Sequence, residues 1–203
     1  MTIYDLKPAF QNLLRPICRY LARIGISANQ VTFLAMSLSM AVGLNFAFFP
    51  DSKWAAMLLP IWLFLRMALN AIDGMLAREH NMQSPLGGIL NEISDVVSDA
   101  ALYLPFALVA GISPAIVVAV VVLGIVAEMA GVVGVQIGAS RRYDGPMGKS
   151  DRAFIFGLLG LLLGLGVELQ RWDDIILTIV AVLSVITIIN RSSKALQELT
   201  SGG

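Results

Sequence analysis

Two apolar stretches of the sequence carry amide and charged side chains at helical spacing. The residues are Arg66, Asn70 and Asp73 in the first stretch and Asn91, Asp95 and Asp99 in the second. Spacings of three and four residues place each set along one face of a helix. Carboxylate and amide oxygens suit hard cations such as Mg²⁺, which also bind substrate phosphates. The pattern indicates a site for a divalent cation; the alternative is a polar network that only joins two helices.

The composition indicates which elements carry these residues. Of the 203 residues, 57% are hydrophobic and 14% charged, and the mean hydropathy is +0.79, whereas soluble domains carry about 25% charged residues. A membrane-spanning helix needs about 20 apolar residues. Segments that come close are 31–49, 54–78, 87–110, 114–137, 153–167 and 174–190. Residues 3–24 predict an amphipathic helix in the headgroup region; the alternative is a short cap packed on the bundle.

These elements predict a single domain, residues 1–203, that is an all-α integral membrane protein with six transmembrane helices plus an N-terminal amphipathic interfacial helix. Six spans place both termini on the side of the 79–86 and 138–152 loops, where most lysines and arginines lie. Because cytoplasmic loops are rich in these residues, both termini are expected in the cytoplasm. The net charge of zero gives no basic field for binding nucleic acid.

The two polar helix faces are expected to meet at similar depth. Asp73 precedes Arg78 by five residues, or about 7.5 Å of helix, and Asp95 lies about 12 Å beyond Gly87. Because the two helices run antiparallel, their polar groups face one cleft that opens to the cytoplasm. Deeper still, at about 18 Å, Arg66 and Asp99 predict a buried ion pair.

The segment 70–95 resembles the signature of the CDP-alcohol phosphotransferase family. That signature is Asp-x2-Asp-Gly-x2-Ala-Arg, eight or nine residues, and then Gly-x3-Asp-x3-Asp. The chain reads Asn70-Ala-Ile-Asp73-Gly74-Met-Leu-Ala77-Arg78, then eight residues, then Gly87-Gly-Ile-Leu-Asn91-Glu-Ile-Ser-Asp95. The six spans and the N-terminal helix extend the resemblance over most of the chain. A shifted register, with Asp95 and Asp99 as the final pair, would lose the spacing between Arg78 and Gly87.

The resemblance implies a membrane enzyme of phospholipid synthesis. It would transfer a phosphatidyl or substituted phosphoryl group from a CDP-activated donor, expected to be CDP-diacylglycerol, to an alcohol and release CMP. The implied cofactor is Mg²⁺ or Mn²⁺. The implied partners are membrane lipids and a second copy of the chain, in a bacterial-type inner (plasma) membrane. Two alternatives remain: diacylglycerol as acceptor with a soluble CDP-alcohol donor, or a non-catalytic protein that retains the fold.

The resemblance also assigns roles to residues of this chain. The implied metal ligands are Asn70, Asp73, Asn91 and Asp95, with Asp73 and Asp95 catalytic and Asp95 a ligand or general base. The implied nucleotide-binding residues are Gly74, Ala77, Arg78 and Gly87, whose small members let a nucleotide approach the backbone. Lys149 and Arg152 are candidates for binding a phosphate of the acceptor or lipid; ordinary cytoplasmic loop charge is the alternative.

The chain departs from the signature at Asn70 and Asn91, where the family has aspartates. Three interpretations follow from the two lost charges: one metal suffices, Glu92 or Asp99 supplies charge, or catalysis is impaired. Glu128 is the single carboxylate of the 114–137 segment, and it is expected either to pair with a loop arginine or to face the cavity. The residues do not identify the acceptor alcohol.

Overall fold

The computed structural model describes residues 3–167 and 171–201, which are helical with short connections and contain no strand. The helices are α1 (Ile3–Arg23), α2 (Ala28–Phe48), α3 (Lys53–Glu79), α4 (Pro85–Tyr103), the short 3₁₀ helix η1 (Leu104–Leu108), α5 (Pro114–Gln136), α6 (Lys149–Gly164) and α7 (Trp172–Ser201).

Serine side chains cap the starts of three helices, α2, α3 and α4. The Ser27 hydroxyl accepts from the backbone N–H of Gln30 at 3.3 Å, and the Gln30 side chain accepts from the Ser27 N–H at 2.8 Å. Ser84 caps α4 by accepting from the Gly87 N–H at 3.0 Å. These bonds satisfy N–H groups that the first helical turn leaves unpaired. The cap on α4 fixes the short connection after α3, so the two polar faces are brought together.

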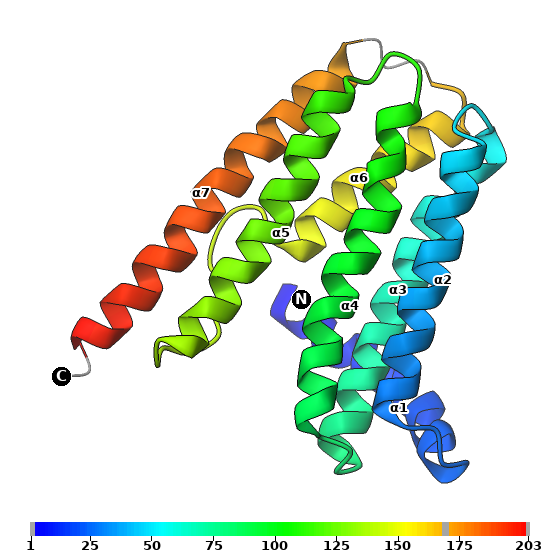
Figure 1. Ribbon diagram of the computed structural model, residues 1–203. Helices are drawn as coiled ribbons and strands as arrows, with labels where there is room; N and C mark the ends of the chain where they lie inside the picture. Colours follow the sequence, from blue (N-terminus) through cyan, green and yellow to red (C-terminus); the bar gives the residue numbers. More distant parts are fainter. Residues whose placement is uncertain (1–2, 168–170, 202–203) are drawn as a thin grey trace.

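Figure 1 shows a bundle in which α6 is inclined to the other long helices and α1 lies across one end. The α3–α4 connection and the C-terminal ends of α5 and α7 lie at that same end. Helix α2 packs on both α3 and α4, α6 packs on α3, and α5 packs on α7. The polar face of α4 therefore lies between an α2–α3 side and an α5–α7 side.

Aromatic contacts in the core join α4 and η1 to α6. The rings of Tyr103 and Phe156 stack with centroids 4.1 Å apart, and Phe106 meets Phe156 edge to face at 5.1 Å. At Gly43 the backbones of α2 and α4 approach closely, since an added Cβ would lie 2.0 Å from the Ala101 carbonyl oxygen. These contacts fix the position of α4 along its own axis relative to α2 and α6.

Within the described residues, four helices are long and apolar enough to cross a membrane: α2, α3, α5 and residues 172–200 of α7. Helix α4 carries three acidic residues, and α6 has 16 residues, fewer than the about 20 needed for a straight crossing. The structure therefore confirms an all-helical protein with apolar spans, while the count of six and the interfacial position of α1 stay predictions. Apolar side chains also cover the outside of the bundle, including Phe33, Ile61, Val122 and Ile179.

Three predicted boundaries were wrong. The 87–110 segment is not one helix, because α4 ends at Tyr103 and Pro105 falls in the 3₁₀ helix η1. Helix α6 starts at Lys149 instead of 153, so Lys149 and Arg152 belong to its first turn and not to a loop. Helix α7 continues to Ser201, well past the predicted end at 190.

Candidate active site

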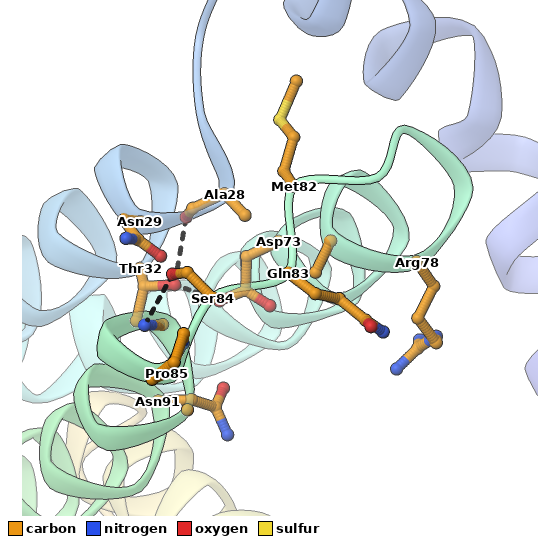
Figure 2. Close-up of a pocket in the computed structure, with 14 residues that line it drawn as sticks. Ala28, Asn29, Thr32, Asp73, Arg78, Met82, Gln83, Ser84, Pro85 and Asn91 are labelled. Atoms are coloured by element: carbon orange, nitrogen blue, oxygen red, sulfur yellow. Dashed lines mark hydrogen bonds between the residues drawn. The ribbon is translucent and has the colours of Figure 1, made fainter.

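A polar cavity of about 540 Å³ lies where α3, α4 and the start of α2 meet (Figure 2). Residues from the three helices and the α3–α4 connection line it: Ala28, Asn29, Thr32, Asp73, Gly74, Ala77, Arg78, Met82, Gln83, Ser84, Pro85, Gly87, Gly88 and Asn91. The cavity thus brings together six residues singled out in the sequence, namely Asp73, Gly74, Ala77, Arg78, Gly87 and Asn91. Its size is within the range of small-molecule sites.

Asp73 is held in place by a hydroxyl. Its side chain is buried, and its Oδ2 accepts a hydrogen bond of 2.8 Å from the Oγ1 of Thr32. Thr32 lies one turn into α2, close to the Ala28 carbonyl, at 3.1 Å. Thr32 was not predicted as a site residue, because in the sequence it is only a hydroxyl residue at the start of an apolar span.

Glycines keep the cavity wall close to the backbone. A Cβ at Gly87 would lie 2.8 Å from the Asn29 Oδ1, and one at Gly74 would lie 3.0 Å from an Arg78 nitrogen. The Arg78 side chain therefore lies along α3 over Gly74, and it is exposed to the cavity. No carboxylate lies within ion-pair distance of Arg78 among the residues that the structure describes.

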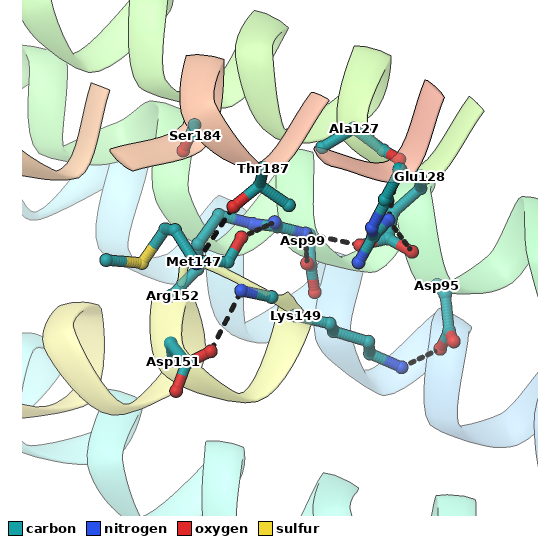
Figure 3. Close-up of polar contacts among 12 residues, drawn as sticks. Asp95, Asp99, Ala127, Glu128, Met147, Lys149, Asp151, Arg152, Ser184 and Thr187 are labelled. Carbon is teal, nitrogen blue, oxygen red and sulfur yellow. Dashed lines mark hydrogen bonds and ion pairs between the residues drawn. The ribbon is translucent and has the colours of Figure 1, made fainter. Parts of the chain in front are cut away.

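Asp95 is surrounded by donors from α3 and α6. Its Oδ1 accepts from the Asn70 amide at 3.2 Å, lies 3.5 Å from a nitrogen of Arg66 and pairs with the Lys149 ammonium. Arg66 also donates to Asp99 at 2.5 Å, which confirms the predicted buried ion pair. The contact between Lys149 and Asp95 (Figure 3) was not predicted, because nothing in the sequence shows that α6 lies next to α4.

The four candidate metal ligands do not all face one space. Asp73 and Asn91 line the polar cavity, whereas Asn70 lines a second cavity of about 620 Å³ between α3 and α6. Arg66 and Lys149 form the rest of the polar end of this second cavity, and its remaining wall is largely apolar. Asp95 lines neither cavity; it is bonded to Asn70, which lines the second. Within the described residues, no three His, Cys, Asp or Glu side chains are grouped to hold a metal.

The other charged candidates are already paired. Arg152 is 2% exposed, and its guanidinium reaches Glu128 at 3.1 Å and Asp99 at 3.5 Å. Glu92 accepts two hydrogen bonds from Arg141, at 3.1 and 2.9 Å. Glu128 does pair with loop residue Arg141, one of the two roles considered for it. Glu92 and Asp99 are therefore neutralised by arginines instead of being open to a ligand.

Fold and site together define a helical membrane protein with a polar cavity at one end of its bundle, lined by Asp73 and Arg78. The chain belongs to the CDP-alcohol phosphatidyltransferase family, whose sequence profile matches residues 26–189. It is a transferase of phospholipid biosynthesis, as the family is.

The relatives agree with this assignment. The chain is 44% identical, over 97% of both chains, to the inner membrane protein YnbA of Escherichia coli K12. It is 32% identical to the phosphatidylinositol phosphate synthase of Mycobacterium tuberculosis over 97 residues, which are 48% of this chain and 43% of that enzyme.

Solved structures show the same fold. The Mycobacterium tuberculosis phosphatidylinositol phosphate synthase with CDP-DAG bound matches with a TM-score of 0.75 and 21% identity, covering 89% of this chain and 92% of that chain. The form of that enzyme with manganese and citrate matches with a TM-score of 0.73 and 23% identity, covering 89% and 88%.

Proposed function

We propose that the chain transfers a phosphatidyl group from CDP-diacylglycerol to an alcohol and releases CMP, with Asp73 and Asp95 at the reacting centre. The observation that carries the proposal is a pair of cavities: Asp73 lines one, and Asp95 is bonded to Asn70, which lines the other. One is polar and contains Arg78, a cation without an acidic partner among the described residues. The other is largely apolar, with Arg66, Asn70 and Lys149 at its polar end.

CDP-diacylglycerol matches both cavities. Its nucleotide and pyrophosphate suit the polar cavity, where Arg78 offers a charge-assisted hydrogen bond. Its acyl chains suit the apolar wall between α3 and α6, which includes Leu63, Phe64 and Leu161. The CDP-DAG held by the solved phosphatidylinositol phosphate synthase supports this donor. A soluble CDP-alcohol would leave the apolar cavity to diacylglycerol, the second donor and acceptor pair to test.

The donor atoms present fit one divalent cation. Mg²⁺ usually takes one or two carboxylates together with substrate phosphates and water. Asp73 offers a carboxylate and Asn91 a neutral oxygen in the same cavity. The charge of Asp95 is already neutralised by Lys149 and Arg66. This pairing supports a site that binds one cation instead of two. When bound, Mg²⁺ or Mn²⁺ would neutralise charge on the donor phosphates; a related enzyme was solved with manganese.

The chain's own residues would position the reaction. The acceptor oxygen attacks the phosphorus that carries the diacylglycerol, and the bond from that phosphorus to the CMP oxygen breaks. Asp95 takes the proton of the acceptor hydroxyl, and CMP leaves with the bridging oxygen. Arg66 and Asn70 orient the Asp95 carboxylate by contacts with its Oδ1. Thr32 does the same for Asp73.

We further propose the setting in which this enzyme works. Residues 1–203 act as one domain in a bacterial inner membrane, with six spans, α1 at the interface and both termini in the cytoplasm. The active chain pairs with a second copy. The apolar outer surface of the bundle and the relative named as an inner membrane protein support the membrane setting.

The test is release of CMP by the purified chain in lipid nanodiscs. Labelled CDP-diacylglycerol is supplied with a panel of alcohols, and CDP-alcohols are supplied with diacylglycerol, each with Mn²⁺, Mg²⁺ or chelator. We expect CMP only from CDP-diacylglycerol plus an alcohol, and only with metal. CMP release only from a CDP-alcohol with diacylglycerol would show that the donor is the soluble CDP-alcohol and the acceptor is diacylglycerol. Equal activity with chelator and with metal would show that the reaction does not need a divalent cation.

A further inference from the structure

Three arginines converge on one buried carboxylate on the far side of α4. Glu128 of α5 is contacted by Arg141 at 3.2 Å, Arg152 at 3.1 Å and Arg191 at 3.3 Å (Figure 3 shows the Glu128–Arg152 part). Both Arg152 and Arg191 are 2% exposed, and Glu128 is 8% exposed. Proteins often bind phosphate with several arginine side chains that converge on one anion.

The surrounding structure is shaped to hold these arginines. Gly124 and Gly131 lie on α5 four residues before and three after Glu128, on the same helix face. A Cβ at Gly124 would lie 3.0 Å from the Arg152 Nε, and one at Gly131 would overlap the Arg141 guanidinium. Backbone groups fix the third arginine, because Arg191 donates to the Ala127 carbonyl at 2.6 Å and to the Asp144 carbonyl at 3.3 Å.

The cluster is connected to Asp95 through a chain of ion pairs. Arg152 contacts Asp99, which pairs with Arg66, and Arg66 contacts Asp95. The Glu128 carboxylate nearly fills the space beside Asp99 and Arg152, where an opening of only about 10 Å³ remains. An entering phosphate would meet the Glu128 carboxylate at the centre of the three arginines, and like charges at that distance repel strongly in a buried site.

We infer that Glu128 occupies the anion position of the acceptor side, so that the enzyme takes an uncharged alcohol and excludes a phosphorylated one. This inference rests on the proposed function. It makes Glu128 a specificity-determining residue that acts through Arg141, Arg152 and Arg191.

The first arm of the test measures anion binding without turnover. The thermal stability of the parent, Glu128→Ala and Glu128→Gln is followed as inorganic phosphate replaces chloride at constant ionic strength. Removing the carboxylate should open the arginine cluster to phosphate, and Glu128→Ala should gain about 3–6 °C at ten times the phosphate Kd. The parent should not respond. Glu79→Ala is the matched control, because it removes a glutamate that pairs with an arginine elsewhere, Arg15 at 3.0 Å.

The second arm measures acceptor choice by CMP release. Glycerol and inositol are compared with glycerol 3-phosphate and inositol 1-phosphate. The parent should prefer each neutral alcohol at least about tenfold in kcat/KM, and Glu128→Gln should reduce that preference by about tenfold. If Glu128→Ala does not fold, the acceptor preferences of the parent and of Glu128→Gln still test the role of Glu128.

The two arms separate the two proposals. A parent that uses phosphorylated alcohols as well as neutral ones, or that binds phosphate as tightly as the Glu128 variants, overturns the role of Glu128. A parent that releases no CMP with any acceptor overturns the proposed function instead. In that case the phosphate arm still shows whether Glu128 fills an anion site.

Discussion

The two sides of α4 treat charge in opposite ways. On the α2–α3 side, the Asp73 carboxylate accepts a hydrogen bond from a neutral hydroxyl, that of Thr32, and Arg78 lies exposed in the same cavity. On the other side, toward α5 and α6, Glu92, Asp99 and Glu128 each pair with arginines. Buried charges are costly unless they are paired. The first side is therefore suited to receive charge from a ligand, whereas the second is already neutralised by the chain itself.

The largest expected effect comes from the side that is open to ligand. Asp73→Asn removes the carboxylate best placed to share a cation with the donor phosphates. Turnover should fall by about 10²–10³-fold, and the concentration of Mn²⁺ needed for half-maximal rate should rise. CMP release titrated with Mn²⁺ measures both. A loss of rate with an unchanged Mn²⁺ requirement would place the metal elsewhere; Glu79→Gln, at an exposed pair, is the control.

On the paired side, the largest effect should be on stability. Arg66→Ala or Asp99→Ala leaves the other charge buried, which costs about 3–5 kcal/mol. The double variant should lose less than the sum of the two single variants, because the pair is removed as a unit. Thermal unfolding of the parent, the two single variants and the double variant in detergent measures this double-mutant cycle. Simple additivity would contradict the 2.5 Å contact between these side chains.

The two asparagines sharpen the comparison, because they set how much positive charge the open side accepts. Asn70→Asp with Asn91→Asp adds two negative charges beside Asp73 and Asp95. Like charges at a buried site favour binding of a further cation. Elemental analysis should therefore show more Mn²⁺ per chain in the double variant than in the parent. The same metal content in both proteins would show that the asparagines are ordinary neutral ligands.

A loop carboxylate should show the smallest effect. A hydrogen bond from Lys194 and then one from Arg142 hold the pKa of Asp144 below its usual value. A lowered folded-state pKa adds stability that is complete above the unfolded pKa of about 3.9 and is lost as pH falls through the folded-state value. Asp144→Asn should lower stability at pH 7 by about 1 kcal/mol or less. Melting curves of the parent and the variant should converge as the pH falls through the folded-state pKa of Asp144; a constant difference at all pH values would contradict the pairing.

Helical spacing was sufficient to predict contacts between neighbouring antiparallel helices. The Arg66–Asp99 pair followed from equal depth on α3 and α4, and the motif correctly grouped Asp73, Gly87 and Asn91 around one cavity. The general fold class also followed, because apolar length depends only on composition and sequence order. The roles of these residues in metal binding and catalysis stay predictions.

Contacts between helices far apart in the sequence could not be predicted. Thr32 meets Asp73 across 41 positions, and Lys149 reaches Asp95 only because α6 is inclined against α3 and α4. Spacing along one helix does not give the order of helices in a bundle. The start of α6 was missed for a related reason: its first turn is polar, and its side chains face Asp95 and Glu128 instead of lipid.

The most direct measurement of the central claim separates binding from turnover in Asp95→Asn. CDP-diacylglycerol binding and CMP release are measured on the same nanodisc preparations of parent and variant, with Mn²⁺ and an alcohol acceptor. A general base acts mainly in the transition state, so its loss costs about 10²–10⁴-fold in rate while ground-state binding persists. We expect the variant to bind CDP-diacylglycerol nearly as well as the parent and to release CMP at least about 100-fold more slowly. CMP release at the parental rate would contradict it.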